Sequence, residues 1–257
     1  MIIRSLKTAS LAGFTAIALA GAVQAAPIIN VSAMGSNAAE SMANAQAAEA
    51  AFLASLHAGS AVTETFESYS AATSSGDQFT SLTTDAASFN FDLAGSGGLC
   101  ASATFDCNGG MAILDADTTP FFGRFPMPDE AGNVNWLDSM DAQELTVSPA
   151  EGYNSIGFYM TDPNDAGGRF EIGGETYDFG KVFGNNAIGS GYAFYVSIFD
   201  SEGLSPFTIY TNNASDGYGI DNVTVGNMAS VPEPGTMALL ALGIAGLGAA
   251  RRRQKAA

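Results

Sequence analysis

Basic side chains are scarce in this sequence. Its 257 residues include nine lysines and arginines against 26 aspartates and glutamates, so the formal net charge is −17 at pH 7. A surface this negative repels phosphate backbones, which excludes nucleic-acid binding as a function. The length predicts a single domain, at roughly 100–200 residues per domain. A hydrophobic content of 47% supplies enough apolar surface for a packed core.

Histidine is scarcer still and occurs once, as His57. A Ser-His-Asp hydrolase would depend on this one residue, and no Gly-x-Ser-x-Gly elbow presents a serine. A histidine-based zinc site needs more histidines or cysteines than the chain contains. We therefore expect no catalytic residues and a protein that is not an enzyme. The acidic residues leave one alternative, a glycosidase that uses two carboxylates.

No run of about 20 consecutive apolar residues, the length that spans a bilayer, occurs anywhere. The N-terminal apolar run, residues 11–20, follows Arg4 and Lys7 and precedes small residues at Val23 and Ala25. A basic flank, a short apolar run and small residues at this spacing are typical of a secretory signal peptide. Residues 1–25 are therefore predicted to be removed by cleavage between Ala25 and Ala26.

The C-terminal apolar run, residues 237–250, has 14 residues and is a marginal membrane anchor by itself. A basic cluster comes after it, and the positive-inside rule keeps that cluster in the cytoplasm, so the body lies outside the inner membrane. The tail is predicted to anchor the chain in that membrane transiently. A plain single-pass anchor is the alternative. The basic cluster consists of Arg251, Arg252, Arg253 and Lys255.

The order of features in residues 231–257 resembles a known sorting signal. Pro232, Glu233 and Pro234 come first, then the apolar run, then the arginine-rich end. This arrangement is similar to the PEP-CTERM sorting signal of exopolysaccharide-producing Gram-negative bacteria. The resemblance implies that an exosortase-type membrane protease recognises the three residues and removes the tail. The protein would then reach the cell surface or the biofilm matrix.

The sequence has two cysteines, Cys100 and Cys107, with six residues between them. In an oxidising compartment outside the inner membrane, such a pair most simply forms a disulfide that closes a short loop. The spacing is not Cys-x-x-Cys, so a redox motif is not indicated.

Removal of both ends leaves a strongly acidic body. Residues 26–231 keep three basic and 25 acidic residues, a net charge near −22. Self-repulsion of this size favours bound cations, and Asp, Asn and Gly in loops supply the oxygen ligands that calcium prefers. The alternatives are a solvated acidic coat and aspartates that only form turns. The predicted calcium ligands, in loops 162–168 and 216–222, are Asp162, Asp165, Asp216 and Asp221.

The pattern of the body predicts one helix and then a series of strands. Residues 37–57 are rich in strong helix formers, with Ser36 or Asn37 as the cap, and Phe52, Leu53 and Leu56 are expected to pack on the strands. Short apolar runs between turn-forming residues predict ten strands, which favours a β-sandwich. The strands are expected at 62–66, 88–93, 121–125, 144–147, 155–160, 169–172, 176–179, 192–199, 206–210 and 219–225.

Four segments of the body, 48–56, 62–69, 156–162 and 216–225, resemble in sequence and order the β-sandwich ectodomain found in many PEP-CTERM proteins. The resemblance implies an all-β, jelly-roll-like sandwich and names no catalytic residues. The predicted organisation is a signal peptide at 1–25, a helical lead segment at 26–60, the sandwich at 61–230 and the sorting signal, with its short apolar helix, at 231–257.

Carbohydrate binding requires exposed aromatic rings beside polar groups. Trp136, the single tryptophan, lies in a polar stretch and is the predicted stacking residue, with Tyr153 and Tyr218 behind it. A buried Trp136 that anchors a loop is the alternative. The function that the sequence favours is non-catalytic binding or organisation of exopolysaccharide at the cell surface or in the matrix. The alternatives are a glycan-active enzyme and an adhesin that binds proteins through sheet edges.

Overall fold

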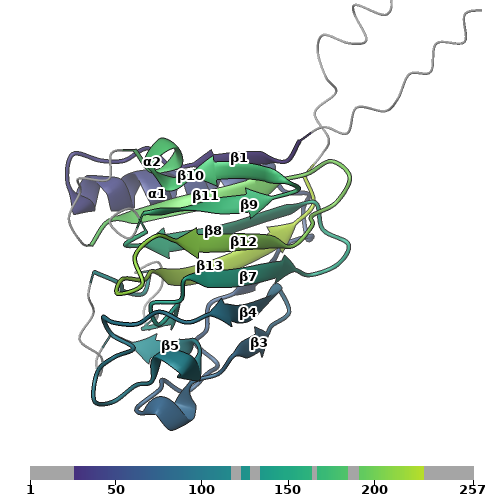
Figure 1. Ribbon diagram of the computed structural model, residues 1–257. Helices are drawn as coiled ribbons and strands as arrows, with labels where there is room; N and C mark the ends of the chain where they lie inside the picture. Colours follow the sequence, from purple (N-terminus) through teal and green to yellow (C-terminus); the bar gives the residue numbers. More distant parts are fainter. Residues whose placement is uncertain (1–25, 117–122, 128–133, 164–166, 185–190, 229–257) are drawn as a thin grey trace, which may run out of the picture.

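The computed structural model describes residues 26–116, 123–127, 134–163, 167–184 and 191–228. Thirteen strands in this part of the chain form two antiparallel sheets that pack face to face (Figure 1). The chain passes repeatedly between the sheets, from β7 to β8 to β9 and from β11 to β12 to β13, as in a jelly roll. The fold is therefore the all-β, jelly-roll-like sandwich that the sequence predicts.

The first sheet has the order β1-β11-β8-β13-β6-β5, and β2 also pairs with β13. Its strands are β1 (Ile28–Val31), β2 (Val62–Glu64), β5 (Ala112–Asp115), β6 (Asn135–Asp138), β8 (Ser155–Thr161), β11 (Ala193–Phe199) and β13 (Gly219–Gly226).

The second sheet has the order β10-β9-β12-β7-β4-β3. Its strands are β3 (Ser81–Thr83), β4 (Ala87–Leu93), β7 (Glu144–Pro149), β9 (Gly168–Ile172), β10 (Glu175–Asp178) and β12 (Phe207–Thr211).

The main core lies between the sheets. Phe158 of β8 stacks on Phe207 of β12 across the sandwich, with ring centroids 5.9 Å apart. A short helix, α2 (Phe179–Val182), closes one edge of this core, because Phe179 is fully buried against Phe170 with centroids 5.0 Å apart. Two single turns of 3-10 helix, η1 (Ser75–Asp77) and η2 (Cys107–Gly109), lie in the connections around β3 and β5.

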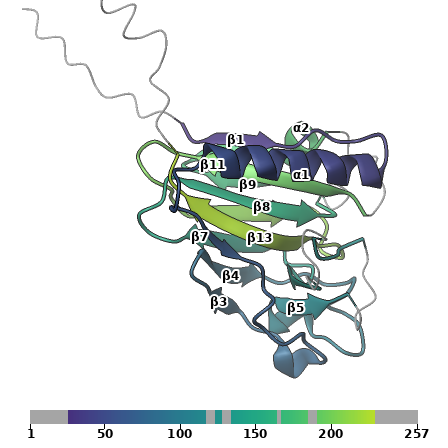
Figure 2. The same ribbon diagram turned by 180° about the vertical axis from the view of Figure 1, so that it is seen from behind.

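Helix α1 (Ala38–Ser55) covers the outer face of the first sheet (Figure 2). Asn37 is its cap and accepts a hydrogen bond from the Glu40 amide at 3.0 Å. Phe52 packs on Tyr195 of β11, with centroids 5.8 Å apart. Leu53, expected to pack inward, is instead 41% exposed, because adjacent helical residues point about 100° apart.

Glycine at position 157 of β8 is required by this packing. A Cβ atom there would lie 2.3 Å from the Tyr195 hydroxyl oxygen. The absent side chain leaves room for the hydroxyl end of the Tyr195 ring over β8, beneath α1.

The lead segment, residues 26–60, contributes directly to the sandwich. It contains α1 and the edge strand β1, in which Ile29 pairs with Ile198 of β11. Nine of the ten predicted strands correspond to observed ones, whereas the expected strand at 121–125 does not: residues 123–125 are not in a strand, and 121–122 lie outside the described residues. Sequence reasoning missed four short strands, β1, β3, β5 and β6.

Candidate functional site

Arg124 lies at the centre of a buried acidic cluster beside the first sheet. Its guanidinium contacts Asp138 at 2.9 Å and Asp141 at 2.6 Å, and all three side chains are almost completely buried. Asp216 lies farther away, at 3.8 Å, and is partly exposed. Burial alone would lower the pKa of Arg124, but Asp138 and Asp141 outweigh it and raise that pKa above its ordinary value. Burial raises the pKa of Asp138, and Arg124 opposes that shift.

Both aspartates also hold neighbouring groups in place. Asp138 accepts a hydrogen bond from the Trp136 indole at 3.1 Å, and Asp141 accepts one from the Cys100 amide at 2.7 Å. Their charges are therefore engaged by protein donors within the fold. This geometry fits a structural cluster that fastens Arg124 and the loop containing Cys100 to the end of β6.

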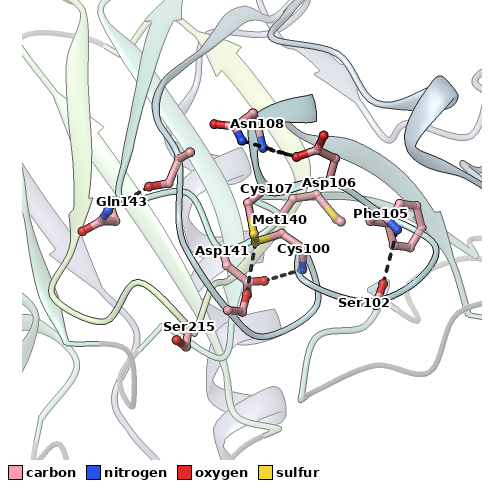
Figure 3. Close-up of a disulfide and its surroundings, with 12 residues drawn as sticks. Cys100, Ser102, Phe105, Asp106, Cys107, Asn108, Met140, Asp141, Gln143 and Ser215 are labelled. Atoms are coloured by element: carbon pink, nitrogen blue, oxygen red, sulfur yellow. Dashed lines mark hydrogen bonds between the residues drawn. A yellow bond between two sulfur atoms is a disulfide. The ribbon is translucent and has the colours of Figure 1, made fainter.

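The disulfide between Cys100 and Cys107 is present, as predicted, with Cα atoms 4.5 Å apart. Figure 3 shows that it lies beside Met140 and Asp141. Cys100 belongs to a small apolar cluster with Trp136 and Met140, on the side of β5 and β6 away from the main core. The disulfide loop thus covers this part of the outer face of the first sheet.

Trp136 is completely buried in β6, not exposed in a polar loop. The prediction that it stacks on a glycan is therefore wrong, because no face of the ring reaches solvent. The alternative, a buried anchor, is what the structure shows. Tyr218 is likewise fully buried, and Tyr153 is only partly exposed beside the main core.

The predicted calcium ligands do not converge in the described part of the chain. Asp162 accepts a hydrogen bond from the Gly191 amide at 3.1 Å, and Asp221 accepts one from the Met127 amide at 2.7 Å. No group of three or more His, Cys, Asp or Glu side chains is placed to hold a metal there. Asp165 lies outside the described residues, so the four-carboxylate site stays a prediction.

The second sheet presents a different outer surface, which we name the open face. Its outward side chains all retain solvent exposure, and most carry hydroxyl, amide or carboxylate groups. It consists of Ser81, Thr83, Ser88, Asn90, Leu93, Glu144, Thr146, Ser148, Arg169, Glu171, Thr176, Asp178, Thr208 and Tyr210, which the register places outward from the six strands. Figure 1 views this sheet from its outer side.

A row of polar side chains crosses the open face from edge to edge. The register aligns one residue from each of the six strands, about 24 Å across at the usual strand spacing. Thr146 and Thr208 share a hydrogen bond at 3.2 Å, and Ser81 donates to Asn90 at 3.0 Å. The row consists of Thr176, Glu171, Thr208, Thr146, Asn90 and Ser81.

A neighbouring row on the open face contains its aromatic ring. The Arg169 guanidinium lies 3.9 Å from the centroid of the Tyr210 ring. It also donates a hydrogen bond to Glu171 at 2.8 Å. Because Glu171 holds the guanidinium in place, the stacking contact orients the Tyr210 ring. Loss of hydration, Glu171 and Glu144 together raise the pKa of Tyr210. A β-bulge places Leu93, 45% exposed, opposite Glu144, roughly 10 Å from Tyr210 along the row.

The open face leads into a hollow of about 520 Å³ at one end of the sheet. Thr83, Ser88 and Ser148 line it from the face, and Glu151 and Pro206 line it from two adjoining turns. A volume of this size matches the range of small-ligand sites, about 300–1,000 Å³. Polar rows, an oriented ring and a hollow make the open face the candidate binding site.

Sequence reasoning missed the open face, although a signal for part of it is present. The sequence predicts a strand at 206–210, and alternation along it puts Phe207 and Ile209 on one side and Thr208 and Tyr210 on the other. With the two apolar residues in the core, Tyr210 must face outward.

The comparisons with known proteins concern the C-terminal end. Residues 230–253 match the family model described as the PEP-CTERM protein-sorting motif. A search of curated proteins and a search of solved structures found no match. Within the described residues no helix is long and apolar enough to cross a membrane, and residues 237–250 lie outside them. The motif indicates export, transient membrane anchoring and processing by exosortase, a membrane protein. The chain is therefore a protein with a C-terminal PEP-CTERM sorting motif.

Proposed function

We propose that the exported protein binds exopolysaccharide through the open face, without catalysis, at the cell surface or in the biofilm matrix. The observation that carries this proposal is the set of polar side chains on six adjacent strands, mostly hydroxyl, amide and carboxylate groups, beside the partly exposed ring of Tyr210. Sugars combine an apolar face with a rim of hydroxyl groups, so they pair well with such a surface.

The charges of the open face narrow the ligand class. Arg169 is its one basic residue, and it already pairs with Glu171. Glu144 and Asp178 add two further carboxylates in the row that contains Arg169 and Tyr210. A surface of this sign favours an uncharged polysaccharide. An acidic one would need divalent cations, such as the calcium predicted from the sequence, as a bridge.

The test is co-sedimentation of the mature chain, residues 26–231, with exopolysaccharide of the producing strain, in calcium and then in chelator. We expect Tyr210→Ala to lose most of the retention, because it removes the ring that would stack on a sugar. Leu53→Ala is the matched control, since Leu53 is also exposed but lies on α1 over the other sheet. Retention that chelator reverses would indicate a cation-bridged acidic polymer.

Equal retention of both variants would place any binding elsewhere than on the open face. No retention in either buffer would overturn the proposal for that polymer. Shortening of the polymer during incubation would instead favour the alternative of a glycan-active enzyme. Sedimentation of the protein without polysaccharide would favour the adhesin alternative.

A further inference from the structure

The last described residues of the chain are held tightly against the body. Asn154 donates from its side-chain amide to the Met228 carbonyl at 3.0 Å and accepts from the Met228 amide at 2.8 Å. The Asn227 side-chain oxygen accepts a hydrogen bond from the backbone amide of Asn154 at 3.1 Å. We name Asn154, Asn227 and Met228 the exit clamp, because they hold the last described residues of the chain against the sandwich.

A second connection holds the exit clamp from the other side. The His57 amide donates to the Asn227 carbonyl at 2.8 Å, the Asn227 amide donates to the Ser60 hydroxyl at 3.1 Å, and Leu56 forms a bridge with Met228. Residues 227–228 are therefore held between the turn after α1 and the turn before β8. The backbone groups of these two residues are occupied by the fold itself.

The sorting motif begins almost immediately beyond the exit clamp. The family match starts at residue 230, and Pro232 comes only four residues after Met228. Four fully extended residues span at most about 14 Å. A protease that acts at Pro232, Glu233 and Pro234 must therefore work within this distance of the folded sandwich.

We propose that the folded body restrains exosortase, so that opening of the exit clamp precedes removal of the tail. A membrane protease that holds its substrate in an extended conformation needs free backbone on both sides of its recognition residues. The exit clamp withholds that backbone on the upstream side.

The test measures the rate of tail removal by pulse–chase in cells that express exosortase. A six-residue Gly-Ser insertion between Met228 and Ala229 lies outside the matched motif and lengthens the connection beyond the exit clamp. We expect tail removal to become several-fold faster. The matched control is the same insertion between Ala26 and Pro27, which leaves the connection unchanged and should leave the rate unchanged. An equal or slower rate in the first variant would overturn the proposal.

A second variant tests the exit clamp itself. Asn154→Ala removes both side-chain hydrogen bonds to Met228, and we expect it to accelerate tail removal less than the insertion does. Asn44→Ala, on α1, is the matched asparagine control, because it also removes a side-chain hydrogen bond to a backbone carbonyl, that of Ala33 at 3.0 Å. Melting temperatures show whether either substitution unfolds the body. If one does, the insertion between Met228 and Ala229 alone tests the proposal. A fully folded Asn154→Ala variant with an unchanged rate would contradict a role for the clamp.

Discussion

The outer faces of the two sheets differ in what lies over them. On the first sheet, outward aromatic rings such as Tyr159, Tyr195 and Trp136 are buried under α1 and the disulfide loop. On the second sheet, the corresponding outward positions carry residues such as Thr146 and Thr208, which remain partly exposed. The same sandwich thus has one face that belongs to the core and one that is available to a ligand.

The burial pattern of single strands shows the same contrast. In β8 and β13 every residue is buried, whereas β7 and β12 alternate between buried and partly exposed residues. A strand covered on both sides can be apolar throughout, and one covered on a single side must alternate. We name the outer face of the first sheet, which α1 and the disulfide loop cover, the covered face. Substitutions on the covered face should therefore change stability, and substitutions on the open face should change binding.

The largest expected effect is that of Arg124→Met on the covered face. It would leave Asp138 and Asp141 buried without their cation, which typically costs about 3–5 kcal/mol. Arg169→Met is the matched substitution on the open face, where the ion pair with Glu171 is partly exposed and contributes at most about 1 kcal/mol. Urea unfolding of both variants measures the difference.

If Arg124→Met does not fold, Asp216→Asn gives a milder test of the same cluster. Asp216 lies 3.8 Å from the guanidinium and is partly exposed, so the expected loss is smaller. Equal stability of Arg124→Met and Arg169→Met would contradict the structural role of the cluster.

Trp136→Ala is expected to lower the free energy of unfolding by about 3–5 kcal/mol, because it removes a completely buried ring from the covered face. It also removes the indole hydrogen bond to Asp138. Tyr210→Ala, the aromatic substitution on the open face, should cost much less stability. Thermal unfolding monitored by circular dichroism compares them, and a near-normal melting temperature for Trp136→Ala would argue against the buried position.

Reduction of the Cys100–Cys107 disulfide should weaken the cover over the first sheet. Loop-closure entropy for a bridge between residues seven apart predicts a loss of about 2.5 kcal/mol. Trp136 is the single tryptophan, so its fluorescence reports on this region alone. Emission should move to longer wavelength and the unfolding midpoint should fall. A spectrum unchanged on reduction, with the midpoint also unchanged, would show that the loop does not depend on the disulfide.

Much of the fold is predictable because its signals are local. The helix at 37–57, the alternating strands and the spacing of Cys100 and Cys107 depend on residues close together in the sequence. The burial of Trp136 is not predictable in this way, because it depends on the disulfide loop, which is distant in the sequence and has no periodic pattern. The cluster at Arg124 depends on similarly distant contacts, so composition and spacing give no sign of it.

The candidate site is predictable only in part. The outward direction of Tyr210 results from alternation along one strand. The rows on the open face require the pairing order of six strands, and the hollow requires Glu151 and Pro206 to meet from two separate turns. These long-range pairings are not encoded in any single segment.

The smallest expected effect concerns the tyrosine hydroxyls of the two faces at alkaline pH. Burial raises the pKa of Tyr195 well above its ordinary value, with Glu49 adding to the shift. A raised pKa in the folded state means that the stability contribution is complete below pH 10, near the unfolded pKa, and is lost as the pH rises above it. For one tyrosine the loss approaches about 1.4 kcal/mol per pH unit.

Tyr195→Phe should flatten this alkaline decline while costing little at pH 7, because its hydroxyl has no hydrogen-bond partner among the described residues. Tyr210→Phe should flatten it less, since the Tyr210 ring is partly exposed and its phenolate can be hydrated. Urea unfolding between pH 9 and 11, with phenolate absorbance at 295 nm, measures both. The free energy of unfolding of the two variants could instead decline equally with rising pH. The covered and open faces would then exclude water from their tyrosine hydroxyls to the same extent, which contradicts the contrast between them.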